Sequence, residues 1–315
     1  MTNEAPIRLG IIGLGAMGSE LLDVADAHPD FTVVLGADPS AGAVERARTR
    51  HPGVTFTRDP DELLRHEGLD AVYIGSPPVT HAAYALHAMK AGLAVFCEKP
   101  LAVSLSEGER MVAAAAAEGA VNALNFTLSD RRAALEVGRA LREDEAGTVL
   151  GVEMRFLFPE WPREFQREAR WVAGREQGGF LREVASHFLY LTDRLLGPLV
   201  PEHKDVVYGT EDEVEATALY RAGEVPVRLL GQVAAAPETY EWTLYGSKRS
   251  YRITGFARLE VADASGWTPV ELDGPRGTEH TRLTAFAHAV RGGEATLPDF
   301  AAGLRVQRLV EHLHA

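Results

Sequence analysis

The first third of the chain alternates short β-rich apolar runs with stretches of helix-forming residues. The apolar runs predict strands at Ile7–Ile12, Phe31–Ala37, Val54–Thr57, Ala71–Ile74, Leu93–Cys97 and Val121–Phe126. The stretches between them predict helices at Ala16–Ala27, Asp61–Glu67, His81–Lys90 and Arg110–Glu118. Nearly continuous apolar strands separated by helices are typical of a parallel sheet that is covered on both faces. The pattern therefore predicts a doubly wound parallel sheet of the kind that binds nucleotides.

The pattern changes after about Phe126. Longer runs there predict strands at Val149–Phe158, Val214–Arg221, Val227–Ala234, Thr239–Tyr245 and Tyr251–Val261. Helices are predicted near Arg131–Arg142, Gly179–Leu196 and Asp299–His314. We therefore predict two domains: residues 1–124, which bind a nucleotide, and residues 125–315, an α+β domain with a largely antiparallel open sheet. The substrate cleft is expected between them.

Charge and cysteine content exclude several classes of partner. The 315 residues include 32 Lys and Arg against 45 Asp and Glu, a net charge of −13, which argues against nucleic acid and an anionic membrane surface. Cys97 is the single cysteine, so a disulfide framework is impossible, and the histidines lack metal-ligand spacing. The N-terminus lacks the apolar core of a signal peptide, and no apolar run approaches a membrane span. We expect a cytoplasmic protein without a metal.

A glycine-rich loop, Gly13-Leu14-Gly15-Ala16-Met17-Gly18, follows the first predicted strand and begins the first helix. The first glycine allows a tight turn, the second lets a pyrophosphate approach the backbone, and the third permits close packing of helix on strand. The N-terminus of the helix adds N–H donors for the anion. The loop therefore predicts a dinucleotide cofactor.

Asp38 closes the second predicted strand, 20 residues after Gly18. A carboxylate at this place accepts hydrogen bonds from the adenosine ribose hydroxyls and repels a 2′-phosphate. No arginine follows Asp38 directly, although Arg46 and Arg48 lie further along the next helix. We therefore predict NAD in preference to NADP.

Lys99 lies at the carboxyl end of the fifth predicted strand, between Glu98 and Pro100. Ligands of open parallel sheets bind outside the carboxyl ends of the strands. By chemistry alone, however, a lysine at the end of a strand is more often exposed to solvent than catalytic. A short-chain dehydrogenase would need a Tyr-x-x-x-Lys pair, and Tyr84 and Lys90 are six residues apart.

Three segments together resemble the Gfo/Idh/MocA oxidoreductase family: 75–81 (Gly-Ser-Pro-Pro-Val-Thr-His), 88–92 (Ala-Met-Lys-Ala-Gly) and 98–102 (Glu-Lys-Pro-Leu-Ala). That family includes glucose-fructose oxidoreductase, inositol dehydrogenases, and many sugar dehydrogenases and ketoreductases. The resemblance covers nearly the whole chain. It implies an N-terminal Rossmann domain, and a C-terminal α/β domain whose open sheet often builds oligomer interfaces.

The resemblance also implies roles for particular residues. The pyrophosphate would be held by Gly13, Gly15, Ala16, Met17 and Gly18, and the adenosine ribose by Asp38. The cofactor groove would be lined by Ser76, Pro77 and His81, with Glu98 and Asn125 near the nicotinamide ribose. Lys99 would reach the reacting oxygen, and the Lys99–Pro100 bond is expected to be cis.

The second-domain motif of the family is a glycine run followed by an Asp four residues before a His. Here Gly178-Gly179 precedes Glu183 and His187, whose spacing puts both side chains on one helical face. A carboxylate beside a histidine favours the imidazolium and orients the ring, which suits a general acid/base near neutral pH. Glu183 replaces the usual Asp, and Arg182 adds a cation near the expected pocket.

An arginine-rich segment lies between Trp161 and Trp171 and contains Arg163, Arg167 and Arg170. It is predicted either to line the same pocket or to form a solvated amphipathic helix with aromatic anchors. The sequence does not decide between these two alternatives.

These observations predict an NAD(P)-dependent oxidoreductase that transfers a hydride between nicotinamide and a hydroxyl or carbonyl of a sugar-like or polyol substrate. The small molecule would be its ligand, and the chain would form a homo-oligomer, a dimer or tetramer, through its partly uncovered sheet. One alternative is an imine or pyrrole-type reductase on the same scaffold. Another is a non-catalytic NAD-binding regulatory protein, which would have no chemical need for Lys99 or His187.

Overall fold

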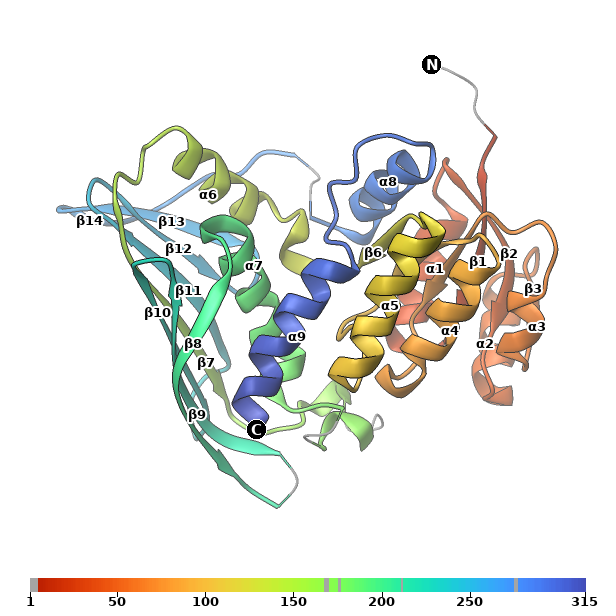
Figure 1. Cartoon of the computed structure of the whole chain (residues 1–315), viewed down its shortest axis with the longest axis horizontal. Helices are drawn as coiled ribbons and strands as arrows, with labels where there is room; N and C mark the ends of the chain where they lie inside the picture. The colour runs from red at the N-terminus through yellow and green to blue at the C-terminus, as the bar shows by residue number, and fades with distance from the viewer. Residues whose placement is uncertain (1–4, 167–169, 175–176, 211, 275–276) are drawn as a thin grey trace. The chain divides into compact units, whose positions relative to one another are not determined.

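The computed structural model describes residues 5–166, 170–174, 177–210, 212–274 and 277–315 (Figure 1). The chain divides into two compact units. Met1–Phe126 and Thr278–Leu304 form the first unit, and Thr127–Gly277 and Arg305–Ala315 form the second. Helix α9 (Phe300–His314) contributes residues to both. The two units are defined by contacts and differ from the predicted domains 1–124 and 125–315, because residues 278–304 belong to the first unit. The predicted division into a nucleotide-binding and a substrate domain at 124/125 stays a prediction.

The sheet of the first unit has six parallel strands in the order β3-β2-β1-β4-β5-β6. The strands are β1 (Ile7–Ile12), β2 (Phe31–Ala37), β3 (Thr55–Thr57), β4 (Ala71–Ile74), β5 (Ala94–Cys97) and β6 (Asn122–Leu124). The helices are α1 (Ala16–Asp26), α2 (Ala41–Arg50), α3 (Pro60–Leu64), α4 (Pro78–Lys90), α5 (Leu105–Glu118) and α8 (Glu279–Val290). The predicted doubly wound parallel sheet is confirmed.

Local sequence explains how this unit begins and ends its elements. Every residue of β4 and β5 is buried, as their apolar composition predicts. Helix α5 begins at the predicted capping box, in which the backbone N–H of Glu107 donates to Ser104 Oγ and the backbone N–H of Ser104 donates to Glu107 Oε2, each over 3.2 Å. It ends at Gly119, whose φ of +59° suits glycine. The strand order reverses between β1 and β4, so their carboxyl ends mark the point where a ligand binds in such sheets.

The sheet of the second unit has eight strands in the order β14-β13-β12-β11-β7-β10-β9-β8, and all pairs except β7 with β10 are antiparallel. The strands are β7 (Val149–Phe158), β8 (Leu199–Tyr208), β9 (Glu213–Ala222), β10 (Val225–Val233), β11 (Thr239–Gly246), β12 (Ser250–Thr254), β13 (Arg258–Asp263) and β14 (Gly266–Pro269). The largely antiparallel sheet is therefore confirmed.

Helices α6 (Arg132–Arg142), α7 (Ser186–Leu196) and the second-unit part of α9 lie along one face of this sheet (Figure 1). Phe156 of β7 packs against Phe188 of α7, with ring centroids 5.2 Å apart. The buried indole N–H of Trp242 donates to Thr192 Oγ1 over 2.9 Å. Aromatic side chains thus fill the layer between the sheet and α7, and the polar edge of the tryptophan is satisfied.

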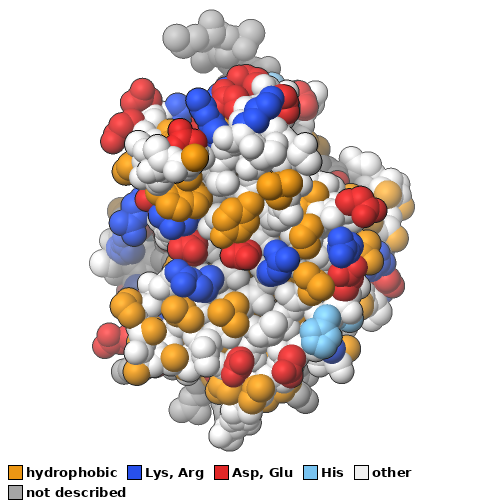
Figure 2. Space-filling model, turned by 90° about the vertical axis from the view of Figure 1, so that its left-hand side faces the viewer, with side chains coloured by type: hydrophobic (Ala, Val, Ile, Leu, Met, Phe, Trp, Pro, Cys, Tyr) orange, Lys and Arg blue, Asp and Glu red, His pale blue; other side chains and the backbone are white. Residues whose placement is uncertain are grey.

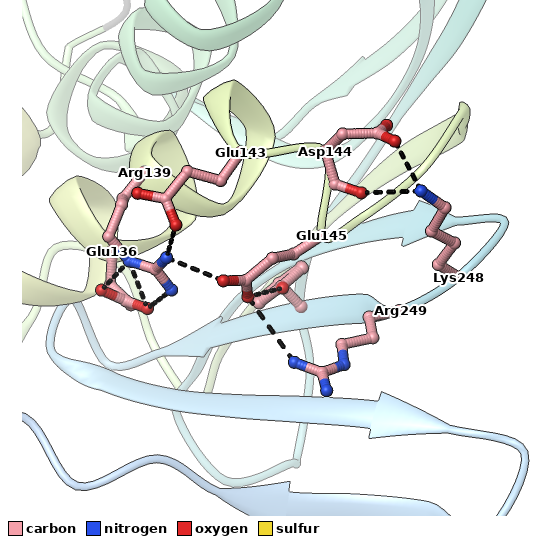
Figure 3. A network of polar contacts seen from close by, with 8 residues as sticks. Glu136, Arg139, Glu143, Asp144, Glu145, Lys248 and Arg249 are labelled. Atoms are coloured by element: carbon pink, nitrogen blue, oxygen red, sulfur yellow. Dashed lines mark hydrogen bonds and ion pairs between the residues drawn. The ribbon is translucent and has the colours of Figure 1, made fainter.

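A network of ion pairs joins α6 to the turn between β11 and β12 (Figure 3). Arg139 bonds Glu136 within the helix over 3.1 Å and Glu145 after the helix over 2.7 Å. The ammonium group of Lys248 donates to the carbonyl oxygen of Asp144 over 3.1 Å. The contacts lie at the surface, so each stabilises the fold by at most about 1 kcal/mol.

Several elements differ from the sequence prediction. The predicted strand Tyr251–Val261 is wrong, because Gly255 and Phe256 adopt φ values of +57° and +65° and turn the chain between β12 and β13. Strands β8 and β14 and helix α8 were not predicted. The outward positions of β8 are mostly polar, and β8 contains Pro201, so its composition resembles a loop more than a strand.

Candidate active site

The glycine loop between β1 and α1 accepts only glycine at two positions. A Cβ at Gly18 would lie 1.8 Å from the carbonyl oxygen of Gly13, and a Cβ at Gly13 would lie 2.5 Å from the backbone nitrogen of Ser76. Gly13 also has a φ of +90°. Gly13 therefore lies close to the segment that follows β4, and Gly18 packs closely on Gly13, as the predicted packing of helix on strand requires.

The N-terminus of α1 fits an anionic group. Its N-cap is Gly15, no side chain caps the helix, and its first turn contains no acidic residue. A Cβ at Gly15 would meet no described atom within 4 Å. The first-turn N–H groups are therefore accessible beside open space, as a pyrophosphate needs. Ala16 and Met17, both exposed, complete the predicted phosphate loop.

Asp38 lies at the end of β2 beside this loop. Its Oδ2 accepts the backbone N–H of Leu14 over 2.8 Å, and its Oδ1 accepts that of Ser40 over 2.8 Å. The carboxylate is thus held next to the glycine loop, where a ribose is expected. Sequence reasoning missed Arg58, whose guanidinium donates two hydrogen bonds of 3.2 Å to the carbonyl oxygen of Pro39. This cation comes from the loop after β3, so only the pairing of β2 with β3 brings it close.

A buried polar cluster lies where β4, β5 and β6 end. Glu98 Oε1 accepts the Tyr73 hydroxyl over 2.6 Å and the Asn125 amide over 2.6 Å. Burial raises the pKa of Glu98, and burial and the neighbouring Glu98 raise the pKa of Tyr73 well above its usual value. Asn125 Oδ1 has no hydrogen-bond partner among the described residues. Such an orphaned acceptor fits a ligand donor such as a ribose hydroxyl. Tyr73 carried no motif that could have identified it.

Lys99 directly follows this cluster and is partly exposed. The Lys99–Pro100 bond is cis, as the resemblance implies. His81 is fully buried: its Nδ1 lies 2.8 Å from the carbonyl oxygen of Pro100, and its Nε2 lies 2.8 Å from that of Ser76. Burial lowers the pKa of His81. His81 therefore ties together the segments that follow β4 and β5.

Ser76 and Pro77 are the second and third residues after β4, at the carboxyl edge of the sheet, where Ser76 is partly exposed and Pro77 is exposed. Ser76 Oγ lies 2.6 Å from Thr80 Oγ1 on α4. The contacts predicted between the cofactor and Ser76, Pro77 and His81 stay predictions.

Glu183 and His187 belong to the second unit. Glu183 lies in a π-helix (η4, Leu181–Ala185), and His187 lies in the first turn of α7. The prediction of a shared face assumed α-helical spacing, and a π turn contains an extra residue, which changes which side chains align. The Glu183–His187 hydrogen bond therefore stays a prediction. Glu183 Oε2 accepts the Gln166 amide over 3.3 Å, and His187 Nδ1 accepts the backbone N–H of Thr127 over 3.2 Å.

Arg163 is linked to Glu183 by Gln166, which hydrogen-bonds to both side chains. Its Nε donates to Gln166 Oε1 over 2.8 Å, its Nη1 donates to the Tyr240 hydroxyl over 3.1 Å, and its guanidinium lies 5.3 Å from the Trp161 ring centroid. Burial lowers the pKa of Arg163, and Glu183 opposes this shift.

The described part of the arginine-rich segment contains two short 3₁₀ helices, η2 (Glu164–Gln166) and η3 (Arg170–Val172). The sequence had allowed one amphipathic helix here as an alternative. Arg167 and the side chain of Arg170 lie outside the described residues.

The Gly178-Gly179 run packs against a buried carboxylate. A Cβ at Gly179 would lie 2.2 Å from Glu213 Oε2, which accepts the backbone N–H of Phe180 over 3.1 Å. Burial raises the pKa of Glu213 to about 7. Arg182, expected as a cation near the pocket, is buried and pairs with Glu311 of α9 through its two terminal guanidinium nitrogens, Nη1 and Nη2. Its charge is therefore compensated within the unit.

In the part of the chain that the structure describes, no three His, Cys, Asp or Glu side chains gather as a metal site would require. None of the described helices is both long and apolar enough to span a membrane. Cys97 is buried in β5, and burial raises the pKa of its thiol well above the usual value, so it has the properties of a small core residue.

Comparison with known proteins identifies the family. The model of the oxidoreductase family's NAD-binding Rossmann fold matches residues 7–126, and the model of its C-terminal alpha/beta domain matches residues 139–314. The chain is 28% identical over 332 residues to inositol 2-dehydrogenase 2 of Paenarthrobacter aurescens, which covers 98% of this chain and 97% of that one.

Two solved structures show the same fold. One is a 3-ketoreductase from Actinomadura kijaniata in complex with NADP and TDP-benzene, with a TM-score of 0.85, 23% identity, and coverage of 98% of this chain and 97% of that one. The other is the WlbA dehydrogenase from Bordetella pertussis in complex with NADH and UDP-GlcNAcA, with a TM-score of 0.84, 22% identity, and coverage of 98% and 96%. Since the two family models match the N-terminal and C-terminal parts of the chain in turn, the chain belongs to the Gfo/Idh/MocA family and is an NAD(P)-dependent oxidoreductase.

Proposed function

We propose that the protein interconverts a hydroxyl and a carbonyl group on a sugar-like or polyol substrate. The observation that carries this proposal is the position of Lys99, a partly exposed cation that directly follows the buried Glu98 cluster and shares a compact unit with the glycine loop. The similarity to inositol 2-dehydrogenase 2 of Paenarthrobacter aurescens supports a polyol or sugar as the substrate class.

We propose the following roles for the residues of the site. The first-turn amides of α1 hold the pyrophosphate, Asp38 binds the adenosine ribose, and Glu98 and Asn125 face the nicotinamide ribose. The nicotinamide supplies or accepts the hydride when the cofactor is bound. Lys99 donates to the substrate oxygen as negative charge develops on it, and His187 contacts the same C–O group. Glu183 orients the groups around His187.

The two alternatives are not favoured. An imine or pyrrole-type reductase would need an imine substrate, whereas the curated relative acts on a polyol, as its name states. A non-catalytic regulatory protein would bind NAD without needing a cation at Lys99. We therefore retain both only as outcomes of the substrate test.

The function is tested with a panel of polyols, sugars, keto-sugars and cyclic imines, with NAD(H) and NADP(H), followed at the nicotinamide absorbance. Turnover of polyols or keto-sugars with no turnover of imines supports the proposal. Turnover of cyclic imines alone contradicts the proposal. Tight binding of the cofactor without turnover of any compound in the panel also contradicts it.

NAD(H) is proposed as the preferred cofactor, because the Asp38 carboxylate repels a 2′-phosphate. NAD(H) should bind more tightly than NADP(H). Asp38→Ala should reduce the ratio of their two dissociation constants by on the order of tenfold, which corresponds to one charge-assisted hydrogen bond. Titration calorimetry with both cofactors measures this. Arg58→Ala is the matched variant, because it removes the nearby cation and should weaken only NADP(H). Equal or tighter binding of NADPH by the unchanged protein would contradict the preference.

A dimer or tetramer is proposed to form through the outer face of the eight-stranded sheet. Val200, Val207 and Leu230, which are 60%, 46% and 40% exposed, lie on outward positions of β8 and β10. Ion pairs lie between such positions, including Arg155 with Glu241 over 3.3 Å. Figure 2 shows hydrophobic side chains interspersed with both signs of charge on this face. Because this face carries apolar groups and both signs of charge, we propose that it pairs with the same face of a second copy under twofold symmetry.

Leu230→Glu should lower the molar mass measured by light scattering after size exclusion, because it places a charge at an outward position of β10 within this face. Val79→Glu, an equally polarising change at a 56% exposed position of the first unit, is the control. A monomeric unchanged protein, or an oligomer that Leu230→Glu leaves intact, would exclude this interface.

The cytoplasm is the proposed location. A single cysteine, buried and without a disulfide partner, suits a reducing compartment. Fractionation of the producing cells, with the protein recovered in the cytoplasmic fraction, would support this assignment.

A further inference from the structure

Glu213 is a buried carboxylic acid that the proposed chemistry does not use. It is the first residue of β9, and its side chain is completely buried. The other buried positions of this strand carry small apolar or aromatic side chains: Ala216, Ala218, Tyr220 and Ala222. Burial of a carboxyl group costs stability unless its oxygens find partners. An acid among such neighbours therefore needs a specific reason.

The carboxylate contacts the glycine turn that precedes the π-helix η4. Glu213 Oε2 accepts the backbone N–H of Phe180 over 3.1 Å. That N–H lies at the N-terminal end of η4, where backbone donors have no partner within the helix, and no side chain of the turn caps it. Glu213 therefore supplies, from β9, the acceptor that the local sequence lacks.

The same carboxylate fixes Gly179 sterically. Gly179 has a φ of +84°, and a Cβ at this position would collide with both carboxylate oxygens of Glu213. The backbone N–H of Gly179 donates to the carbonyl oxygen of Val172 over 2.9 Å. The carbonyl oxygen of Gly179 in turn accepts the backbone N–H of Glu183 over 3.0 Å. A displacement of Gly179 would therefore displace the backbone of Glu183, four residues further along the chain.

Phe180 is fixed through its side chain as well. Its ring stacks on Phe158 of β7, with centroids 5.3 Å apart, and lies against Gly231 of β10, where a Cβ would collide with it. The turn is thus held to the sheet by an apolar contact and by the Glu213 hydrogen bond. The apolar contact sets where the ring lies, whereas the directional hydrogen bond sets how the backbone of Phe180 is oriented.

We propose that Glu213 is a positioning residue of the candidate active site: its carboxylate fixes the turn at Gly179 and Phe180, and through this turn the backbone of Glu183. The proposal rests on the proposed function, in which Glu183 belongs to the site. Two general observations agree with it. π-helical turns occur frequently at functional sites. Acids with a raised pKa also cluster there, and burial raises the pKa of Glu213 to about 7.

The hold on the turn is tested by ¹⁹F NMR of the full chain labelled with fluorotryptophan. Trp161 reports on the turn, because its indole N–H donates over 3.3 Å to the Val172 carbonyl oxygen that also accepts Gly179. Its signal is assigned by its loss in Trp161→Phe. Glu213→Val removes the acceptor and should shift or broaden this signal. Glu213→Gln keeps an amide oxygen that can accept the Phe180 N–H, so the signal should stay in place.

The signals of Trp242 in β11 and Trp267 in β14 are internal controls, because other strands separate β11 and β14 from β9. Glu215→Val changes an exposed acid of the same strand and should move no signal. The same Trp161 signal in Glu213→Val as in the unchanged protein would overturn the proposal. If Glu213→Val does not fold, Glu213→Asp takes its place with the same expectation, because it withdraws the carboxylate by one methylene group.

Kinetics on the substrate found in the panel test the effect on the site. Glu213→Val should lower kcat by roughly 10–100-fold, because a small misplacement of a site residue slows the chemical step. Glu213→Gln should keep most of its kcat. The affinity for NADH measured by calorimetry should not change in either variant, since the glycine loop and Asp38 belong to the other unit. Full kcat in a folded Glu213→Val protein would show that Glu213 is only structural and would overturn the proposal.

The outcomes also separate this proposal from the proposed function. If the unchanged protein turns over no compound of the panel, the proposed function fails, whereas the Trp161 signal still decides whether Glu213 holds the turn. If turnover is found, and Glu213→Gln loses as much kcat as Glu213→Val with an unchanged Trp161 signal, the proposed function stands. The carboxylate would then act through its charge, and the positioning role would be wrong.

Discussion

Lys99→Ala is expected to lower kcat by roughly 10²–10⁴-fold while NAD(H) binds with unchanged affinity. Lys99 is the second residue after β5, and its ammonium group is the proposed donor to the oxygen on which negative charge develops during reduction. Its removal leaves the phosphate loop, Asp38 and the Glu98 cluster in place, so the loss should fall on the chemical step. Steady-state kinetics on the substrate identified in the panel, with calorimetric titration of NADH, measure the two quantities separately.

Lys90→Ala is the matched control, because Lys90 is an exposed lysine at the end of α4 in the same unit. It should keep full kcat. A Lys99→Ala protein with nearly full kcat would show that Lys99 is not the donor to the reacting oxygen. A variant that loses NADH binding in parallel with turnover would assign Lys99 to the cofactor instead.

The free energy of unfolding is expected to fall as the pH rises from about 5 to about 8, and Glu213→Gln should abolish most of this fall. Burial raises the pKa of Glu213 from 4.5 to about 7, so between these values the folded state binds a proton that the unfolded state has released. Stability therefore decreases with rising pH across this window. The difference corresponds to about 3 kcal/mol when the carboxyl is fully ionised. Urea unfolding at several pH values measures it.

The titratable and charged groups around Glu213 include Arg182 of the π-helix, the adjacent Asp212, and His314 of α9, whose Nε2 lies 3.2 Å from Glu213 Oε1. Glu215→Gln is the control, because Glu215 is exposed on the same strand. It should leave the slope unchanged. A Glu213→Gln protein with the same pH dependence as the unchanged protein would show that the Glu213 carboxyl does not titrate in this range.

Features that depend on neighbouring residues in the chain were predictable. The glycine loop, the capping box at Ser104 and the αL glycine at 119 all act within a few residues, and each appears where the sequence places it. Strands β1 and β2 were predicted to the residue, because their apolar runs are bounded by turn residues on both sides. The acid at the end of β2 could be anticipated because the spacing from glycine loop to acid is set by one βαβ unit.

Features that depend on contacts across the chain were not predictable. Arg58 reaches Pro39 only because β3 pairs with β2, and Tyr73 reaches Glu98 only because β4 pairs with β5. The turn at Phe256 interrupts a run that composition alone presents as one strand. No local pattern distinguishes such a residue from its neighbours.

For this protein, composition and spacing were enough to predict the doubly wound sheet and the dinucleotide loop, because each depends on residues close together in the chain. The candidate lysine and histidine came instead from the resemblance to a known family. The hydrogen bond from Thr127 to His187, the pairing of Arg182 with Glu311 and the raised pKa of Glu213 came only from the folded chain. They depend on which donors, charges and apolar groups surround a side chain after folding. Desolvation and hydrogen bonding act through space, so residues far apart in the sequence set the chemistry of the groups they enclose.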